Sequence, residues 1–265
     1  MKNQAVTSSG LRLFWLLLKR DFKLRYAGAG FGSLWNIFHP VLLFSVYALV
    51  FGYFLKFKAR LLGQQIDFLP FLFTGFWPWI AFSDGLIRCA YIVFEYATII
   101  KRVRFSVAVL VPLAVVGALT PLVIGFLLLS GFLGFKGNFY LSLERVPLLL
   151  IPLFLQLFLS LGLGYLIATL TVYVRDFQQL LPALLNLWFF LTPIFYSLDL
   201  VPHWLRKILF LNPWQVILAW YRQLFLSPHL KWGLGEQWVF PLVFLLLGIG
   251  FWIFKRGSRF FPDLL

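Results

Sequence analysis

Residues 105–135, FSVAVLVPLAVVGALTPLVIGFLLLSGFLGF, contain no charged side chain over 31 positions. A helix needs about 20 residues to cross the roughly 30 Å of hydrocarbon in a bilayer. At about 1.5 Å per residue, the whole stretch would form a helix about 46 Å long, which exceeds one crossing. We therefore predict a transmembrane helix at about 108–133, with the excess lying along the membrane interface before Pro112.

The composition of the whole chain agrees with this local pattern. Hydrophobic residues make up 62% of the sequence and charged residues 12%, and the mean hydropathy is +0.90. A soluble domain has about 45–50% apolar and about 25% charged residues. The polar side chains here are too few to cover a soluble globule, so we predict an integral membrane protein.

Charge and cysteine content exclude several classes of function. The net charge of +14 would indicate nucleic acid binding in a soluble chain. Here the basic residues are spread between apolar segments, so we expect membrane lipids, and no nucleic acid, as their partner. The single Cys89 excludes an internal disulfide, a CxxC redox pair and a cysteine zinc site. The apolar run 13–18 is too short for the core of a signal peptide.

Six segments are long and apolar enough to cross a membrane as helices. Their predicted bounds are about 34–56, 68–92, 108–133, 146–173, 177–198 and 237–255. Membrane-spanning strands would be about 9–11 residues long with alternating polarity. Helices also satisfy their own backbone groups inside lipid. The prediction is an all-α integral membrane fold, with a single transmembrane domain over residues 31–265.

A seventh apolar segment, 208–221, is only 14 residues long and contains Asn212 and Pro213. Runs of this length are more often re-entrant than spanning. With six crossings both termini lie on one side, which we predict to be cytoplasmic. That side then holds 13 Lys and Arg residues (six before residue 30, three in 101–104, Arg175 and three in 255–259) against 9 outside. The excess follows the positive-inside rule.

The N-terminal segment 1–30 has the pattern of an amphipathic helix. Apolar side chains recur on one helical face, at Leu11, Phe14, Trp15, Leu18 and Phe22. Basic residues occupy much of the other face. A helix of this kind lies in the plane of the membrane surface. It serves either as a simple topology anchor or in a functional role.

Charged residues inside a predicted crossing are the next candidates for function. Asp84 and Arg88 lie one turn apart in segment 68–92, and Glu95 continues the same face. Such charges are expensive in lipid and face a cavity or a partner. They either line a translocation path or form a local ion pair near the membrane boundary.

Aromatic residues make up 20% of the chain, with 33 Phe, 10 Tyr and 11 Trp. Interfacial belts account for many Trp and Tyr, and most of the rings face lipid or the core. Aromatic faces also suit carbohydrate. Catalytic and metal motifs are absent from the sequence: His39, His203 and His229 are scattered, and no GxxxxGK[ST] loop occurs. We expect no catalytic residue, metal or cofactor in this chain.

Four stretches together resemble one family. They are RDFKLRYAGAGFGSLWNIFHP (20–40), IIKRVRFSVAVLVPLAVV (99–116), VYVRDFQQLLPALLNLWFFLTPIFYSLDLVP (172–202) and LNPWQVILAWYRQLFL (211–226). Their order and spacing are similar to the membrane permease of ABC transporters that export polysaccharides such as O-antigen, capsule and teichoic acid. One departure is Ser106, since the family commonly has Phe-Pro at positions 105–106.

The resemblance implies a homodimer in a bacterial inner membrane, with two cytoplasmic ATP-binding subunits that bind ATP and magnesium. It implies a cytoplasmic coupling helix at about 95–105, which would contact the ATPase. The coupling residues would be Tyr96, Ile99, Ile100, Lys101, Arg102, Val103, Arg104 and Phe105. It also implies periplasmic gate helices at about 202–229, bordering the exit.

The substrate implied is a polysaccharide linked to undecaprenyl diphosphate. Residues expected to contact the lipid diphosphate are Arg20, Lys23, Arg25 and Tyr26, since Arg pairs well with phosphate oxygens. Residues expected along the translocation path are Trp35, Asp84, Arg88, Tyr196, Trp214 and Trp220.

The function implied is ATP-driven export of this lipid-linked polysaccharide from the cytoplasm to the outer face of the membrane. One alternative is a permease for drugs or small lipids with the same fold; the short loops favour glycan export. A polyprenyl-lipid transferase would need paired acidic residues or a His in a cytoplasmic loop, and 97–104 offers neither. A passive channel would need a repeated polar stripe in one crossing.

Overall fold

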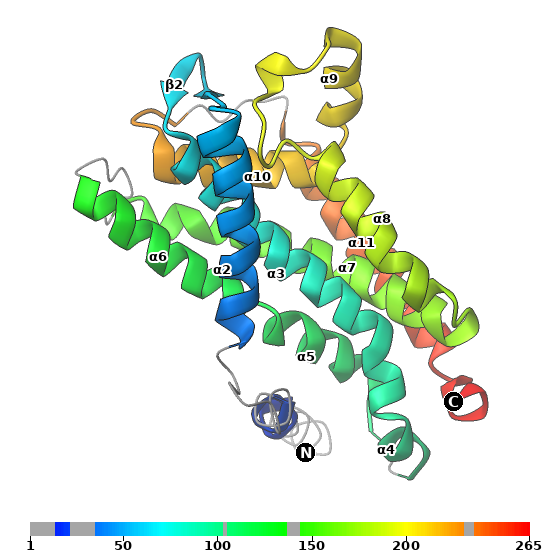
Figure 1. The fold of residues 1–265 in the computed structure, drawn as a ribbon. Helices are drawn as coiled ribbons and strands as arrows, with labels where there is room; N and C mark the ends of the chain where they lie inside the picture. The colour runs from blue at the N-terminus through cyan, green and yellow to red at the C-terminus, as the bar shows by residue number, and fades with distance from the viewer. Residues whose placement is uncertain (1–13, 22–34, 103–104, 137–143, 231–235) are drawn as a thin grey trace.

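The computed structural model describes residues 14–21, 35–102, 105–136, 144–230 and 236–265. Almost all of these residues are helical (Figure 1), so the predicted all-α class is confirmed. Helices lie in each of the six ranges predicted to cross the membrane. Several of them are interrupted or end at residues that the sequence pattern did not single out.

Residues 35–102 contain two long helices joined by a small hairpin, followed by a short helix. Helix α2 spans Trp35–Tyr47 and continues as a π-helical segment, Ala48–Phe54. Strands β1 (Ala59–Leu61) and β2 (Gln64–Ile66) pair antiparallel. Leu62 and Gly63 connect them with φ of 52° and 82°, as two-residue hairpin turns require. Helix α3 (Phe68–Glu95) follows, then the short helix α4 (Ala97–Arg102).

The uncharged stretch 105–135 is divided in two. After a 3-10 turn at Val107–Val109, helix α5 spans Leu110–Gly117 and helix α6 spans Thr120–Lys136. The chain bends between them, just before Pro121. Pro112 lies in the first turn of α5, where proline is tolerated because that N–H has no helical partner. The interruption after Gly117 was not predicted, and the 3-10 turn before α5 lies in the range where the excess residues were expected.

In the described residues from 144 onward, three long α-helices and three short ones follow. Helix α7 (Leu150–Tyr173) follows a 3-10 turn at Val146–Leu149, and α8 spans Phe177–Leu191. Helix α8 ends seven residues before the predicted 198, because Pro193 disfavours a helical conformation at Thr192. The last four helices are α9 (His203–Phe210), α10 (Pro213–Leu226), α11 (Val239–Gly257) and α12 (Phe261–Leu264).

Helix α3 forms the centre of the molecule. It packs against α5, α6, α7, α8 and α10, and α7 packs along α11. Buried apolar residues of α3, α7, α8 and α10 form the largest core cluster. One buried polar link joins three of these helices. The Gln156 side chain donates to the Pro78 carbonyl at 3.2 Å and accepts from the Tyr221 hydroxyl at 2.9 Å.

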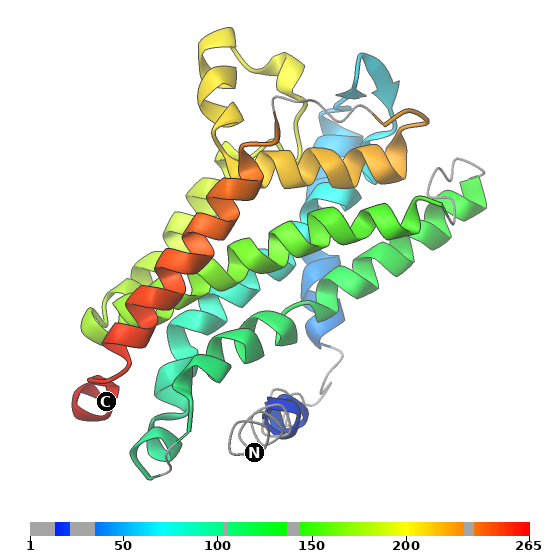
Figure 2. The ribbon, with the colours of Figure 1, turned by 180° about the vertical axis from the view of Figure 1, so that it is seen from behind.

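The short elements lie at the two ends of the long helices. Residues 14–21, α4 and α12 lie at one end, and the hairpin, α9 and α10 lie at the other, in both views (Figures 1 and 2). Among the described residues, three helical stretches are long and apolar enough to cross a membrane: Val107–Phe135, Val146–Tyr173 and Val239–Gly257. Phe38–Phe54 and Phe177–Leu191 are shorter and apolar. Helix α3 is less apolar than these three and is covered mostly by protein.

Candidate functional site

A groove runs between α2, α3 and α8. One part, with a volume of about 350 Å³, is lined by Trp35, His39, Pro40, Ile80, Ser83, Asp84, Ile87 and Pro121. A second part of about 280 Å³ shares Ile80, Ser83 and Ile87 and extends to Tyr47, Trp79 and Asn186. The groove therefore combines aromatic walls with a carboxylate, an amide, a hydroxyl and an imidazole. We call it the α2–α3–α8 groove.

Two residues predicted along a translocation path, Trp35 and Asp84, line this groove. Trp35 is 41% exposed. Its ring lies edge-to-face with the Phe38 ring, with 5.5 Å between the ring centroids. Asp84 is half-buried on α3. The sequence placed Asp84 and Trp35 in different segments, and the structure brings them to the same surface. A carboxylate and an indole in the lining of one groove offer a polar handle and a flat apolar face to a ligand.

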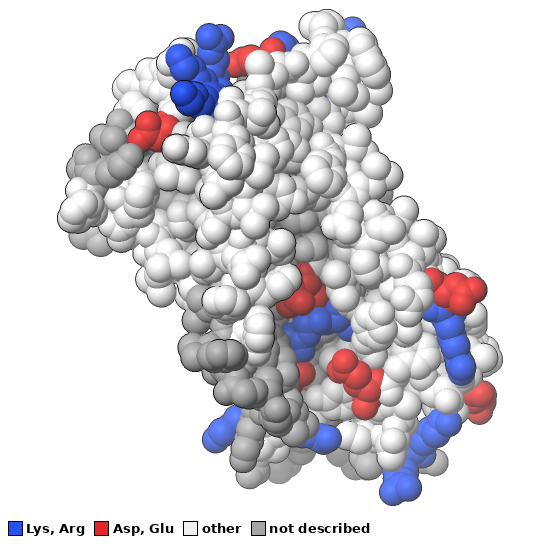
Figure 3. All heavy atoms as spheres, in the orientation of Figure 1, with Lys and Arg blue, Asp and Glu red and all other residues white. Residues whose placement is uncertain are grey.

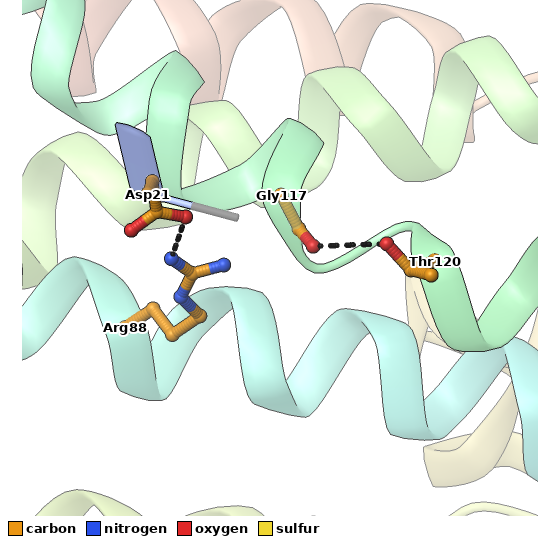
Figure 4. A network of polar contacts seen from close by, with 4 residues as sticks. All are labelled: Asp21, Arg88, Gly117 and Thr120. Atoms are coloured by element: carbon orange, nitrogen blue, oxygen red, sulfur yellow. Dashed lines mark hydrogen bonds and ion pairs between the residues drawn. The ribbon is translucent and has the colours of Figure 1, made fainter. Parts of the chain in front are cut away.

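Arg88 has a partner outside its own helix. Its Nη2 donates to Asp21 Oδ2 at 2.6 Å, with side-chain exposures of 16% and 11% (Figure 4). Near this pair, Thr120 Oγ1 donates to the Gly117 carbonyl at the bend between α5 and α6. The ion pair that Arg88 forms therefore joins the N-terminal helix to α3. Sequence reasoning did not single out Asp21 for this role.

The remaining predicted path residues lie elsewhere. Trp214 and Trp220 are buried in the core, where the Trp214 ring stacks on Phe82 at 4.3 Å and the Trp220 Nε1 donates to Glu236. Tyr196 is half-buried beyond α8, and its hydroxyl donates to the Phe190 carbonyl at 3.2 Å. In this conformation these three side chains do not belong to the α2–α3–α8 groove.

The predicted coupling turn forms helix α4 at the end of α3. Tyr96 and Ile100 are buried, Ile99 is half-buried, and Lys101 and Arg102 are exposed. Ile100 joins a second core cluster with Leu17, Leu18 and Phe261. Phe105 packs against the same cluster. One face of the turn therefore packs against the rest of the chain, and the basic face with Lys101 and Arg102 is exposed. Val103 and Arg104 lie outside the described residues.

The N-terminal helical segment 14–21 docks beside α4. Leu17 and Leu18 are buried and Arg20 is exposed, but Trp15, which was predicted on the apolar face, is 62% exposed, and Leu17, which was not, is buried. The Arg20 Cζ lies 6.0 Å from the centre of the Tyr96 ring. Burial is the main cause that raises the pKa of Tyr96, and the Asp21 carboxylate also raises it. Lys23, Arg25 and Tyr26, predicted to contact a lipid diphosphate, lie outside the described residues.

The sequence pattern also did not predict a buried arginine at the hairpin end of the molecule. Arg222 of α10 is 5% exposed, donates to the Ile194 carbonyl at 2.7 Å and lies 3.5 Å from the centre of the Phe71 ring. It fastens α10 to the turn after α8. The only signal in the sequence was that Arg222 closes an apolar segment, which describes a helix end as well as a buried cation.

Charge is unevenly distributed over the surface. Figure 3 shows an uncharged band between a group of Lys and Arg side chains at the hairpin end and mixed charges toward the other end. Within the described ranges, His, Cys, Asp and Glu do not gather in a group of three that could hold a metal ion.

Comparison with known proteins adds to this geometry. The sequence model of the ABC-2 type transporter family matches residues 12–226. An O-antigen export system permease protein RfbA from Myxococcus xanthus is 31% identical over 220 residues, 81% of this chain and 80% of the relative. An RfbA of the same description from Klebsiella pneumoniae is 28% identical over 259 residues, 94% of this chain and 93% of the relative. The polysialic acid transport protein KpsM from Escherichia coli is 23% identical over 247 residues, 88% of this chain and 89% of the relative. This chain belongs to the ABC-2 type transporter family of integral membrane proteins.

Proposed function

We propose that this chain is the membrane permease of an ATP-driven exporter in a bacterial inner membrane. Its cargo is a lipid-linked polysaccharide of the O-antigen type, which it moves from the cytoplasm to the outer face. The observation that carries this proposal is the agreement among relatives matched over most of their length: RfbA proteins named for O-antigen export and KpsM named for polysialic acid transport.

The orientation we propose has six crossings and both termini in the cytoplasm. The crossings are α2 with its π-helical extension, α3, α5 with α6, α7, α8 and α11. The grouping of residues 14–21, α4 and α12 at one end supports this arrangement. The exposed bases Lys101, Arg102, Lys255, Arg256 and Arg259 lie on these elements or next to them. Helices α9 and α10 then lie at the outer end as gate helices, with α10 re-entrant.

Helix α4 is the proposed coupling helix. Two cytoplasmic ATP-binding subunits hold ATP and magnesium, and each contacts one α4 through Lys101 and Arg102. The buried side chains Tyr96 and Ile100 fix α4 to α3, so a displacement of α4 is passed to the central helix of the bundle. Residues 14–21 pack on the same cluster and move with it.

The α2–α3–α8 groove is the proposed wall of the path. Two copies of the chain form a homodimer in which the two grooves face each other. Aromatic walls with scattered polar groups suit a sugar chain, because C–H faces of sugars pack on rings while hydroxyls find hydrogen-bond partners. At the cytoplasmic end, Arg20, Lys23, Arg25 and Tyr26 receive the diphosphate of the undecaprenyl-linked glycan.

The first test is co-purification of this chain with the ATP-binding subunit of its transporter, followed by ATPase measurement. Lys101→Glu with Arg102→Glu reverses the open face of α4. The pair Lys255→Glu and Arg256→Glu is the control, since it reverses two exposed bases at the same end of the molecule. We expect the α4 reversal to lower recovery of the ATPase severalfold, because like charges now meet across the contact. The control pair should have a small effect.

Two outcomes would contradict the proposal. If the wild-type chain recovers no ATPase, the exporter function loses its main support. If the wild type binds but the α4 reversal changes neither recovery nor ATPase activity, α4 is only a topology anchor and the coupling role is wrong.

A further inference from the structure

The hairpin end carries a row of basic side chains that the proposed function does not use. Lys56, Lys58 and Arg60 are exposed, while Phe57 and Ala59 between them point inward. We call these three residues the basic strip. In the proposed orientation they lie outside, where transmembrane proteins are poor in Lys and Arg. Three such residues within five positions run against that trend.

The basic strip is held on a fixed platform. Ala59 is buried beside Phe71 and Phe225 in the third core cluster, and β1 pairs with β2. The Arg60 backbone N–H donates to Ser197 Oγ at 2.7 Å, which ties the hairpin to the turn after α8. Lys56 has a φ of 47°, which a non-glycine residue adopts at an energetic cost and keeps only where its surroundings impose it.

Three arginines at this end are engaged in holding the fold. Arg145 donates to the carbonyls of Ser227 and Pro228, and Arg206 donates to those of Val201 and Asp199. Arg222 is buried against Ile194. The basic strip groups three exposed cations within five positions of the chain. Segment 55–69 contains one acidic residue, Asp67, so its net charge is +2.

A mostly apolar groove, with Asp67 as its carboxylate, lies close to the basic strip along the chain, since its lining residue Tyr53 precedes Lys56 by three positions. It has a volume of about 370 Å³ and is lined by Ala48, Gly52, Tyr53, Asp67, Phe68 and Leu69, between the π-helical segment and the start of α3. Tyr53 and Phe54 are 73% and 65% exposed next to it. Exposed cations close in the chain to a mostly apolar groove are complementary to a lipid with an anionic head.

We propose that the basic strip and this groove form an acceptor site for a lipid diphosphate at the outer end of the molecule. This inference rests on the proposed function, since the ligand is the exported polyprenyl-linked glycan after it has been reoriented. The diphosphate contacts Lys56, Lys58 and Arg60, and the polyprenyl chain lies in the groove. A diphosphate carries more charge than the single phosphate of a phospholipid head, which is why three cations favour it.

The test uses a photoactivatable polyprenyl diphosphate and the complex of this chain with its ATP-binding subunit in nanodiscs of zwitterionic lipid. Labelled peptides are mapped by mass spectrometry. We expect label in segment 48–69, reduced at least about tenfold by Lys56→Gln with Lys58→Gln and Arg60→Gln, since each base near a membrane surface contributes about 1 kcal/mol. The charge-matched control Lys255→Gln, Arg256→Gln and Arg259→Gln, at the opposite end, should leave this label unchanged.

A second variant tests the groove itself. A Cβ at Gly52 would lie 3.1 Å from the Phe68 ring, so Gly52→Leu fills the groove without touching the basic strip. Label should fall here too. Excess unlabelled polyprenyl diphosphate should compete, and phosphatidylglycerol at the same concentration should not.

The inference is overturned if the label is unaffected by both variants, or if phosphatidylglycerol competes equally, which would make the site a general contact for anionic lipid. Recovery and activity of the ATPase are measured on the same samples. An active complex without label in segment 48–69 contradicts the acceptor site alone. A chain that binds no ATPase contradicts the proposed function on which the acceptor site rests.

Discussion

Asp21 and Arg88 join two helices that are 67 positions apart in the chain. Asp84 and Arg88 share a helical face, so the sequence could identify a polar position on α3. It could not identify Asp21 as the partner, because the partner depends on where the N-terminal helix docks. That docking is set by Leu17 and Leu18, whose burial brings Asp21 to α3.

Substitutions at this pair should weaken the docking of the N-terminal helix. Both side chains are largely buried, so Asp21→Asn or Arg88→Met should lower the free energy of unfolding by about 1–3 kcal/mol. The double variant should lose less than the two single losses combined, because the second change removes a group that has already lost its partner. Thermal unfolding of the purified chain in detergent measures all three.

The exposed Asp263→Asn of α12 is the control for this cycle and should be close to neutral. Single losses that simply add in the double variant would show that the two charges do not stabilise each other. The N-terminal helix would then be held by its apolar residues alone.

At the scale of elements, hydrophobic patterning locates the long helices because each is a continuous apolar run. It locates the interruptions poorly. The bend after Gly117, the early end of α8 and the π-helical segment Ala48–Phe54 lie inside apolar sequence, where hydropathy does not change. The hairpin was missed for another reason: β1 and β2 are three residues each and depend on packing against α3 and α6 for their stability.

The crossing of α7 and α11 depends on glycine. A Cβ built on Gly250 would lie 2.2 Å from the Gly162 carbonyl oxygen, so only glycine allows the two backbones to approach this closely. Gly250→Ala should force the helices apart and lower the free energy of unfolding by about 1–3 kcal/mol. Detergent unfolding measurements and recovery of the assembled complex check this.

Gly248 supplies a matched control in the same helix. A Cβ there meets nothing within 4 Å, so Gly248→Ala should be neutral or slightly stabilising. Equal effects of the two substitutions would mean that the close approach of α7 and α11 does not contribute to stability.

For the whole molecule, composition and hydropathy are enough to predict an all-α membrane protein, and four sequence stretches suffice to indicate its family. The candidate site is harder to predict. The α2–α3–α8 groove combines residues from three segments that lie far apart in the sequence. Because aromatic residues are so common in this chain, the sequence does not show which rings line the groove. Trp35 and Asp84 both line the groove, whereas Trp214 and Trp220 are buried in the core.

In the proposed function this chain, with its ATP-binding subunit, moves a lipid-linked polysaccharide across a membrane. The most direct measurement reconstitutes the complex in proteoliposomes that carry the glycan on the ATP-accessible face and follows its protection from an external glycosidase. We expect protection that requires ATP and is lost with a hydrolysis-deficient ATPase. A complex that hydrolyses ATP normally and leaves the glycan exposed would contradict the proposed function.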